Sequence, residues 1–254
     1  MRSLLATVLT NVFLVVGSLV FALGAIAGTL LPPPGLWSFR SARLWGRGLL
    51  WCAGVRLDVA REAPLLPGER YVFVCNHQSL FDIPVLLVTL PGSTRLLAKR
   101  SLFRIPVFGW AMRASGFVPV DRENRSRAKE AMDGALRQLD LGRSILLFPE
   151  ETRSEDGRIR EFQRGGFLIA LKAKCPLVPV GIAGTRAIQR KGSLLVRPGA
   201  VRVRYGTPVD PSRAGVRGRR ELIETLRTEV IRLSGEPGVE REVAVLERGE
   251  TAAS

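Results

Sequence analysis

The amino-terminal segment from Leu4 to Leu31 contains no charged residue over 28 positions. As a helix it would measure about 42 Å, at about 1.5 Å per residue, against about 30 Å for the hydrocarbon core of a bilayer. Arg2 before the segment and Ala-Ile-Ala at 25–27 also fit a cleaved signal peptide, but the apolar run is about twice as long as a signal-peptide core. We therefore expect a retained helix that anchors the chain in a membrane.

A second helical segment follows the first. Three prolines and Gly35 end the apolar helix, and the stretch from Leu36 to Gly54 is again helical in pattern. It contains three of the four tryptophans, Trp37, Trp45 and Trp51. Its three arginines are spaced three and four residues apart and therefore lie on one stripe of the helix, at Arg40, Arg43 and Arg47. Such a helix suits the headgroup layer of a membrane, although a core helix with a solvated edge has the same pattern. Residues 1–54 are therefore expected to form a membrane-anchoring two-helix segment.

Composition limits the partners and the compartment. The net charge is +15, from 38 Lys+Arg against 23 Asp+Glu, which favours anionic partners such as lipid headgroups, phosphorylated substrates or nucleic acid. Three cysteines without metal-ligand spacing predict no disulfide framework and a reducing compartment. If Arg40, Arg43 and Arg47 mark the cytoplasmic side, the rest of the chain faces the cytoplasm from the cell inner membrane.

Beyond residue 54 the sequence alternates between strand-like and helix-like segments, which is typical of an α/β domain. Strands are predicted at 55–60, 71–75, 95–98, 116–120, 145–148, 177–183 and 200–205. Helices are predicted at 83–90, 126–139, 165–174 and 222–233. We expect one domain over 55–234, followed by a polar, mobile tail at 235–254.

The only histidine, His77, stands five positions before Asp82. Histidine is the side chain whose ordinary pKa lies nearest neutral pH, so it is the natural candidate for proton transfer. Residues five apart on one helix diverge by about 140°, so the two side chains can meet only if His77 lies on a loop and the chain turns back at Asp82. The carboxylate would then hold one ring nitrogen and leave the other as a base. A loop histidine beside a capping aspartate is the alternative.

Two further polar clusters also follow predicted strands. Asp121 and Arg122 come directly after the strand at 116–120, and Glu150 and Arg153 follow the strand at 145–148. The carboxyl ends of strands are where open α/β sheets place their ligands. Three such clusters predict one shared crevice that combines a base with cations suited to a phosphate group.

Four sequence blocks resemble those of the glycerolipid acyltransferases typified by bacterial 1-acylglycerol-3-phosphate acyltransferases. The blocks are NHQSLFD at 76–82, GFVPVDR at 116–122, FPEETRS at 148–154 and PLVPV at 176–180, and Lys99 stands where the family often has a lysine. They occur in order between Val72 and Gly184. The resemblance implies a mixed central sheet flanked by helices, of the glycerol-3-phosphate acyltransferase type.

The resemblance also implies a reaction. A fatty acyl group would move from acyl-CoA or acyl-carrier protein to the free hydroxyl of a lysophospholipid, foremost 1-acylglycerol 3-phosphate, giving phosphatidate. His77 and Asp82 would be the catalytic pair, because an alcohol needs a base while a thioester is already activated. The substrate-binding residues would be Lys99, Arg122 and Arg153 for the phosphate, with Glu150 anchoring the glycerol or orienting an arginine. No metal and no cofactor beyond the acyl donor is expected.

One position departs from the family pattern, because Glu151 stands where the family has glycine. A negative charge there suggests an acceptor without a terminal phosphomonoester. Other acceptors, such as glycerol 3-phosphate, a lyso-ornithine lipid or another lysophospholipid, stay open. A non-catalytic, membrane-anchored binder of anionic lipid or nucleic acid also stays open, although aromatic residues are not interleaved with the later arginines as single-strand binding favours. Membrane lipids are expected partners, and nucleic acid is not.

Overall fold

A computed structural model describes residues 1–33, 35–91, 93–121, 127–213 and 218–238 of the chain. Its centre is a seven-stranded sheet in the order β1-β7-β6-β2-β5-β3-β4. The strands are β1 (Val55–Arg61), β2 (Val72–Cys75), β3 (Arg95–Lys99), β4 (Val118–Val120), β5 (Ile145–Leu147), β6 (Leu177–Ala183) and β7 (Gly199–Tyr205). All neighbouring strands are parallel except β6 and β7. The predicted mixed sheet is therefore confirmed.

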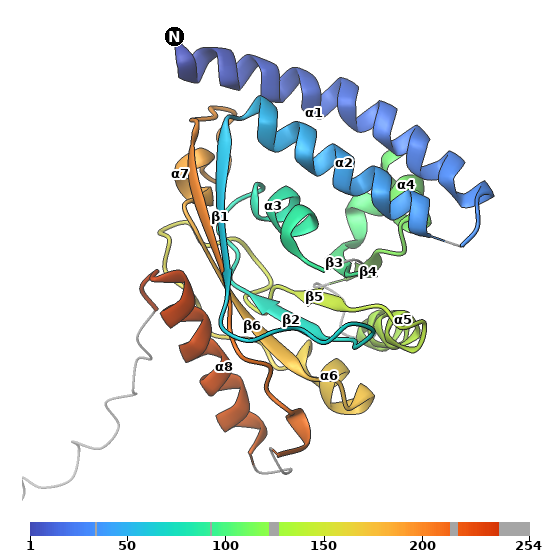
Figure 1. Ribbon diagram of the computed structural model, residues 1–254, viewed down its shortest axis with the longest axis vertical. Coiled ribbons are helices and arrows are strands. Elements are labelled where there is room, and N and C mark those ends of the chain that lie inside the picture. Colours follow the sequence, from blue (N-terminus) through green and yellow to red (C-terminus); the bar gives the residue numbers. More distant parts are fainter. Residues whose placement is uncertain (34, 92, 122–126, 214–217, 239–254) are drawn as a thin grey trace, which may run out of the picture.

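Helices cover both faces of this sheet (Figure 1). They are α1 (Arg2–Ala27), α2 (Leu36–Cys52), α3 (Asp82–Thr89), α4 (Phe108–Ala114), α5 (Ala128–Asp140), α6 (Phe167–Ala173), α7 (Thr185–Ile188) and α8 (Arg219–Ser234). Short 3-10 turns are η1 (Gly28–Leu30), η2 (Arg100–Arg104) and η4 (Pro211–Arg213). The sequence analysis did not predict α4 or α7, and the four residues of α7 are too few to show a periodic apolar face.

The segment that forms strand β2 is continuously apolar because both faces of the strand are covered. Phe73 and Cys75 point into the core shared with α2 and α3, whereas Val72 and Val74 point into the core shared with α5, α6 and α8. Successive side chains of a strand alternate between faces, so a strand covered on both faces needs apolar residues at every position. The sheet is thus buried between two helical layers.

Helices α1 and α2 form an antiparallel pair that lies across one face of the domain (Figure 1). The side chains of Ser38, Ser41 and Trp45 on α2 bond to Ala25 O, Phe21 O and Ser18 Oγ of α1 at 2.6, 2.7 and 2.9 Å. At Gly28 a Cβ atom would lie only 2.9 Å from the Ser38 backbone nitrogen, so a larger residue could not sit there. The pair is therefore a packed unit.

The outer surface of α1 is a row of exposed leucines and valines, and the helix is long and apolar enough to cross a membrane by length and composition. Its inner surface contacts the domain near both ends, and near the carboxyl terminus Ala22 and Ala25 pack against Ala111 of α4. Near the amino terminus, Thr7 Oγ1 exchanges hydrogen bonds with Val196 N and O, and Asn11 Nδ2 donates to Leu194 O. The whole length of α1 therefore lies along the domain.

Two side chains of α2 differ from the headgroup stripe that the sequence predicted. Trp45 lies between α1 and α2, and Arg43 Nη2 donates to Val88 O at 2.9 Å. Burial lowers the pKa of the Arg43 guanidinium. The other arginines and tryptophans of this helix face outward. Arg40 stacks over the Trp37 ring, and Trp51 is exposed. One edge of α2 thus packs against the rest of the molecule, and the other edge is exposed.

The chain beyond α8 begins in ordered contact with the domain. Ile159 N donates to Pro237 O at 2.8 Å, and Ile159 pairs with Gly238 as an isolated bridge. The first residues of the predicted mobile tail are therefore held in place. Residues 239–254 of that tail lie outside the described residues.

Candidate active site

Four neighbouring strands end at the same edge of the sheet. Strands β2, β5, β3 and β4 lie side by side and run parallel, so the residues after Cys75, Leu147, Lys99 and Val120 emerge together. This edge collects the loops that carry the predicted polar clusters. The shared edge expected from the sequence is present because all four strands are parallel.

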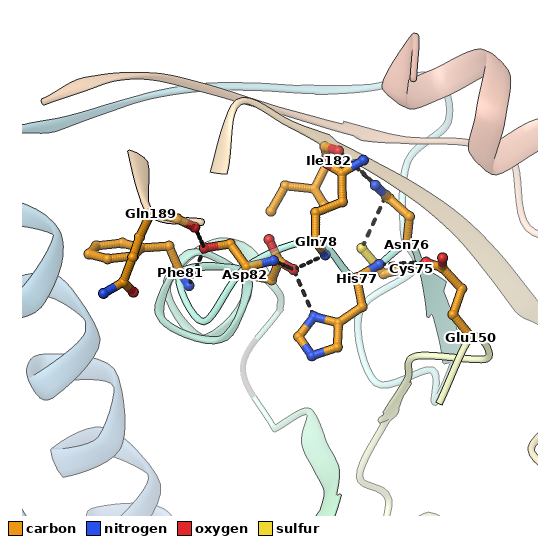
Figure 2. A network of polar contacts seen from close by, with 10 residues as sticks. Cys75, Asn76, His77, Gln78, Phe81, Asp82, Glu150, Ile182 and Gln189 are labelled. Carbon is orange, nitrogen blue, oxygen red and sulfur yellow. Dashed lines mark hydrogen bonds and ion pairs between the residues drawn. The ribbon is translucent and has the colours of Figure 1, made fainter. Parts of the chain in front are cut away.

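The loop after β2 carries His77 and turns back at Asp82, the first residue of α3 (Figure 2). His77 Nδ1 and Asp82 Oδ2 are 2.7 Å apart. The carboxylate is fully buried, whereas 12% of the histidine side chain is exposed. In Figure 2 the other ring nitrogen, Nε2, points away from Asp82. The imidazole is thus held on one side and reachable from the other.

Asp82 organises the loop as well as the imidazole. The same oxygen, Oδ2, accepts the backbone N–H groups of Gln78 and Ser79 at 2.7 and 2.9 Å. One carboxylate oxygen thus contacts two backbone N–H groups and a ring nitrogen. Asp82 therefore fixes both the loop backbone and the ring that the loop carries.

The other polar residues of the loop join it to neighbouring elements (Figure 2). Asn76 exchanges two 2.9 Å hydrogen bonds with the backbone of Ile182, which extends the pairing of β2 with β6 by one residue. Gln78 Nε2 donates to Gly157 O, and Ser79 Oγ donates to Gln189 O, each at 2.8 Å. The block resists displacement because each polar residue has its own anchor.

The segment after β5 wraps around His77. The Phe148 ring stacks on the imidazole with centroids 4.1 Å apart. Glu150 Oε1 accepts the His77 backbone N–H at 2.7 Å, and Ser154 N donates to His77 O at 2.9 Å. Arg153 lies within this turn and is half-buried. The turn thus fixes the backbone on both sides of the His77 side chain.

Glu150 has a different set of contacts from those the sequence suggested. It is 5% exposed, and its second oxygen, Oε2, accepts the backbone N–H of Arg160 at 3.0 Å. Burial raises the pKa of this carboxyl to about 7, against the opposing effect of the two backbone donors. Both oxygens bind backbone groups rather than the Arg153 guanidinium, so Glu150 braces two loops here.

Cations and a carboxylate gather at the ends of β3 and β4. Lys99 is the exposed last residue of β3 and pairs with Val120 in the register. Asp121 lies 3.3 Å from Arg127 and 3.9 Å from Arg100. Arg122, predicted as a phosphate ligand, lies outside the described residues. Lys99 is thus brought to the same sheet edge as His77.

Glu151 adopts a backbone conformation that favours glycine. Its φ is +59°, in the left-handed region, and its side chain is exposed. A side chain at such a position costs about 1–2 kcal/mol relative to the right-handed region. The backbone here therefore has a conformation that glycine adopts at no steric cost, while the position carries a carboxylate beside Glu150.

One supporting residue was not predicted from the sequence. Arg227 on α8 is nearly buried and donates to the carbonyl oxygens of Ile159 and Arg160 at 3.2 and 3.1 Å. Arg160 in turn donates its N–H to Glu150. An arginine in an amphipathic helix is usually exposed to solvent, so the sequence pattern did not indicate this contact.

The described residues offer no group of three His, Cys, Asp or Glu side chains that could hold a metal ion. Their polar groups at the sheet edge are instead one imidazole, buried carboxylates and several cations. This set suits proton transfer next to an anionic substrate.

Comparison with known proteins agrees with the geometry. The model of the family described as Acyltransferase matches residues 56–183, about half of the chain. The chain belongs to the acyltransferase family. The resemblance noted in the four blocks is thereby confirmed, and these blocks supply most of the acyltransferase site described above.

Among relatives of this acyltransferase sequence, a 1-acyl-sn-glycerol-3-phosphate acyltransferase of Cocos nucifera is 34% identical over 165 residues, which are 65% of this chain and 53% of the relative. The chloroplastic 1-acyl-sn-glycerol-3-phosphate acyltransferase BAT2 of Brassica napus is 40% identical over 144 residues, 56% of this chain and 42% of the relative. The chain thus spans about half the length of these curated relatives.

A solved acyltransferase structure extends the likeness to nearly the whole chain. The crystal structure of the 1-acyl-sn-glycerophosphate (LPA) acyltransferase PlsC from Thermotoga maritima matches with a TM-score of 0.77 at 27% identity. The match covers 91% of this chain and 94% of that chain. The fold of the family therefore includes most of the amino-terminal segment.

Proposed function

We propose that this protein transfers a fatty acyl group from a thioester to the free hydroxyl of a lysophospholipid, foremost 1-acylglycerol 3-phosphate, giving phosphatidate. The observation that carries the proposal is the 2.7 Å contact of His77 Nδ1 with Asp82 Oδ2 at the sheet edge. Family membership and the names of the relatives support it. The acyl donor is acyl-CoA or acyl-carrier protein.

The reaction follows from this geometry. With its Nδ1 proton donated to Asp82, the His77 ring uses Nε2 to accept the proton of the lysolipid hydroxyl. The hydroxyl oxygen attacks the thioester carbonyl carbon, a new C–O bond forms, and the C–S bond breaks. The leaving thiolate takes the proton back from the imidazolium. No acyl-enzyme intermediate is required, because the thioester is already activated.

Cations at the same edge would hold the acceptor phosphate. We assign this role to Lys99, Arg122 and Arg153, since guanidinium groups offer two parallel donors to phosphate oxygens. Glu150 would act by bracing the His77 loop, in line with its two backbone contacts. A phosphate held there would orient the glycerol hydroxyl toward Nε2.

We place the protein on the inner face of the cell membrane with the α/β domain in the cytoplasm. Because α1 is tied to the domain near both of its ends, by Thr7 and Asn11 at one end and by packing against Ala111 of α4 at the other, the helix would lie in one leaflet rather than cross to the other side. The exposed leucines and valines of α1 would then contact acyl chains. The acceptor lipid would reach the site from the same leaflet.

The proposal is tested by thiol release from acyl-CoA in the presence of purified protein and lysolipids. We expect release that depends on an added lysolipid and is lost in His77→Ala, since the variant has no base. A control, Arg232→Met, alters an exposed arginine on α8 and should keep the activity. Binding of lysolipid or nucleic acid without any acyl transfer by the wild-type protein would contradict the proposal.

A second class of acceptor is favoured by the position of Glu151. Its carboxylate stands in the turn that wraps His77, where it would repel a dianionic phosphomonoester. We propose that it shifts preference toward lysolipids whose phosphate carries a further headgroup. The ratio of kcat/KM for lysophosphatidate to that for lysophosphatidylethanolamine should rise several-fold in Glu151→Gln, which keeps size and backbone strain. An unchanged ratio would remove this role.

A further inference from the structure

Two segments of the α/β domain contact α1, one near each of its ends, and expose large apolar side chains. We call them flank A (residues 102–110, in η2, α4 and their link) and flank B (residues 194–195, in the loop after α7). Leu102, Ile105 and Trp110 of flank A and Leu194 and Leu195 of flank B are exposed. Trp110 is 58% and Leu194 73% exposed. Such large apolar side chains at the surface of a domain need a partner when they are contiguous.

Flank A is packed directly against the carboxyl-terminal half of α1. Ala111 of α4 meets Ala22 and Ala25 of α1, with Ile26 and Val107 around them. Small residues on both helices allow this close approach. Trp110 is the neighbour of Ala111, so an outward-facing indole stands beside the apolar face of α1. Figure 1 shows α4 beside this half of α1.

Flank B is tied to the amino-terminal half of α1. Asn11 Nδ2 of the helix donates to Leu194 O at 3.1 Å, and Thr7 exchanges two hydrogen bonds with Val196. The bonds use the backbone of the loop, which leaves the side chains of Leu194 and Leu195 outside. Thus both ends of α1 have a domain segment whose apolar side chains are exposed next to it.

Each flank leads directly to the reaction centre. We call the sheet edge that carries His77 and Lys99 the active edge. Flank A begins three residues after Lys99, the last residue of β3. Flank B follows Gln189, whose carbonyl accepts the Ser79 hydroxyl of the His77 loop at 2.8 Å. Both flanks are thus connected to the sheet edge that carries His77 and Lys99, flank A along the chain and flank B through Gln189.

Exposed arginines accompany both segments. Arg104 and Arg113 stand beside flank A, and Arg190 and Arg197 beside flank B. A tryptophan and leucines bordered by arginines match the boundary between acyl chains and anionic headgroups. A protein partner would not explain why both segments adjoin the apolar surface of α1.

We propose that flanks A and B are additional membrane contacts, which insert into an anionic leaflet near the two ends of α1. This inference rests on the membrane placement in the proposed function and extends it from the two-helix segment to the α/β domain. Insertion at three places would hold the active edge at the headgroup level. A lysolipid could then enter the site without leaving the leaflet.

The test uses full-length proteins with a single tryptophan and vesicles of phosphatidylcholine and phosphatidylglycerol with brominated acyl chains. One protein keeps Trp110 and has phenylalanine at the other three tryptophans. A second protein has phenylalanine at all four native tryptophans and carries Leu194→Trp. A third has the same four replacements and carries Leu66→Trp in the turn before β2. A fourth keeps only Trp51, which reports on α2. Brominated chains quench an indole that reaches them.

We expect about a twofold loss of fluorescence for Trp110 and for the indole at 194, as for interfacial residues, and none at 66. Quenching of Trp51 alone would overturn the inference and leave the membrane placement intact. Quenching of none would contradict the membrane placement as well. A Trp110 emission shift that depends on protein concentration without lipid would identify a second copy as the occupant and overturn the proposal.

A second measurement does not depend on replacing the packed Trp45. Trp110→Ser and Leu194→Ser each change only an exposed side chain outside the catalytic machinery. Both should keep the wild-type kcat on lysolipid in detergent micelles and raise the apparent KM several-fold on vesicles. Leu66→Ser should alter neither value. Equal apparent KM values for all four proteins on vesicles would contradict a role of the flanks in membrane contact.

Discussion

Asp82 Oδ2 accepts two backbone N–H groups and also contacts His77 Nδ1. In Asp82→Asn the side chain keeps its shape, and its amide oxygen can still accept the two backbone N–H groups. That oxygen is a weaker hydrogen-bond acceptor for the imidazole than a carboxylate oxygen. The His77 ring would lose its oriented tautomer. We expect kcat to fall by about 10² to 10⁴ with intact folding. Steady-state thiol release together with circular dichroism checks this, and near-normal kcat would contradict it.

Glu150 makes the stability of the fold depend on pH. Its carboxyl keeps a proton up to about pH 7 in the folded protein, whereas in the unfolded chain it loses the proton near the ordinary value of 4.5. The folded state therefore binds more protons in this range, and its free energy of unfolding falls as pH rises from about 4.5 to about 7. Glu150→Gln removes this contribution to the slope.

The variant also leaves one partly buried backbone N–H without its acceptor, which costs about 1 kcal/mol at every pH. The stability difference between wild type and Glu150→Gln should thus shrink as pH rises. Urea unfolding at several pH values between about 4.5 and 8 measures it. A difference that is constant over this range would show that Glu150 is ionised throughout.

Glu151 stores strain that a glycine would release. We expect Glu151→Gly to raise the free energy of unfolding by about 0.5–1 kcal/mol, after the greater freedom of glycine in the unfolded chain is subtracted. Lys174→Gly is the matched control, because Lys174 also has a left-handed φ, +48°, at the end of α6. Both should stabilise the protein, and only Glu151→Gly should alter the acceptor ratio. A lower free energy of unfolding for Glu151→Gly than for the wild type would contradict the claim that the backbone at Glu151 is strained.

At the scale of elements, α8 supports the site through Arg227. The path runs from its guanidinium to Arg160 O, from Arg160 N to Glu150, and from Glu150 to His77 N. Arg227→Met should lower kcat several-fold and cost about 1–3 kcal/mol, since the buried carbonyl of Ile159 and the partly buried carbonyl of Arg160 lose their donor. Arg227→Lys should restore part of kcat.

The control for this prediction is Arg232→Met on the same helix. Arg232 is exposed and pairs with Glu62 and Glu229, and exposed pairs are worth less than about 1 kcal/mol. It should leave kcat unchanged. Equal kcat for the two methionine variants, measured well below their unfolding temperatures, would show that α8 does not act on the site.

The alternation of strands and helices could be predicted because buried parallel strands must be apolar on both faces, as in β2 and β6. The meeting of His77 with Asp82 could be predicted as one of two alternatives from spacing alone. The contacts of Glu150, Arg43 and Arg227 could not, since each bonds to a backbone group far away in sequence. Backbone partners have no signature in side-chain patterns.

For the whole molecule, a net charge of +15 and an apolar face should act together on a membrane. We expect tight binding to anionic vesicles that weakens as salt rises, because the screening length falls from about 10 Å at 0.1 M to about 3 Å at 1 M. Binding to neutral vesicles should be weaker and insensitive to salt. Co-sedimentation with vesicles measures both, and salt-independent binding to anionic vesicles would show that charge contributes nothing.

The hydrogen bonds between Thr7 and Val196 join residues 189 positions apart. During synthesis, α1 therefore leaves the ribosome long before its docking site exists, and domains complete their packing only as later segments emerge. Throughout that interval the helix is an exposed apolar segment, which a signal-recognition factor or the bilayer would meet first. Delivery to the membrane would thus precede folding, and the catalytic domain would assemble on lipid that is already in place.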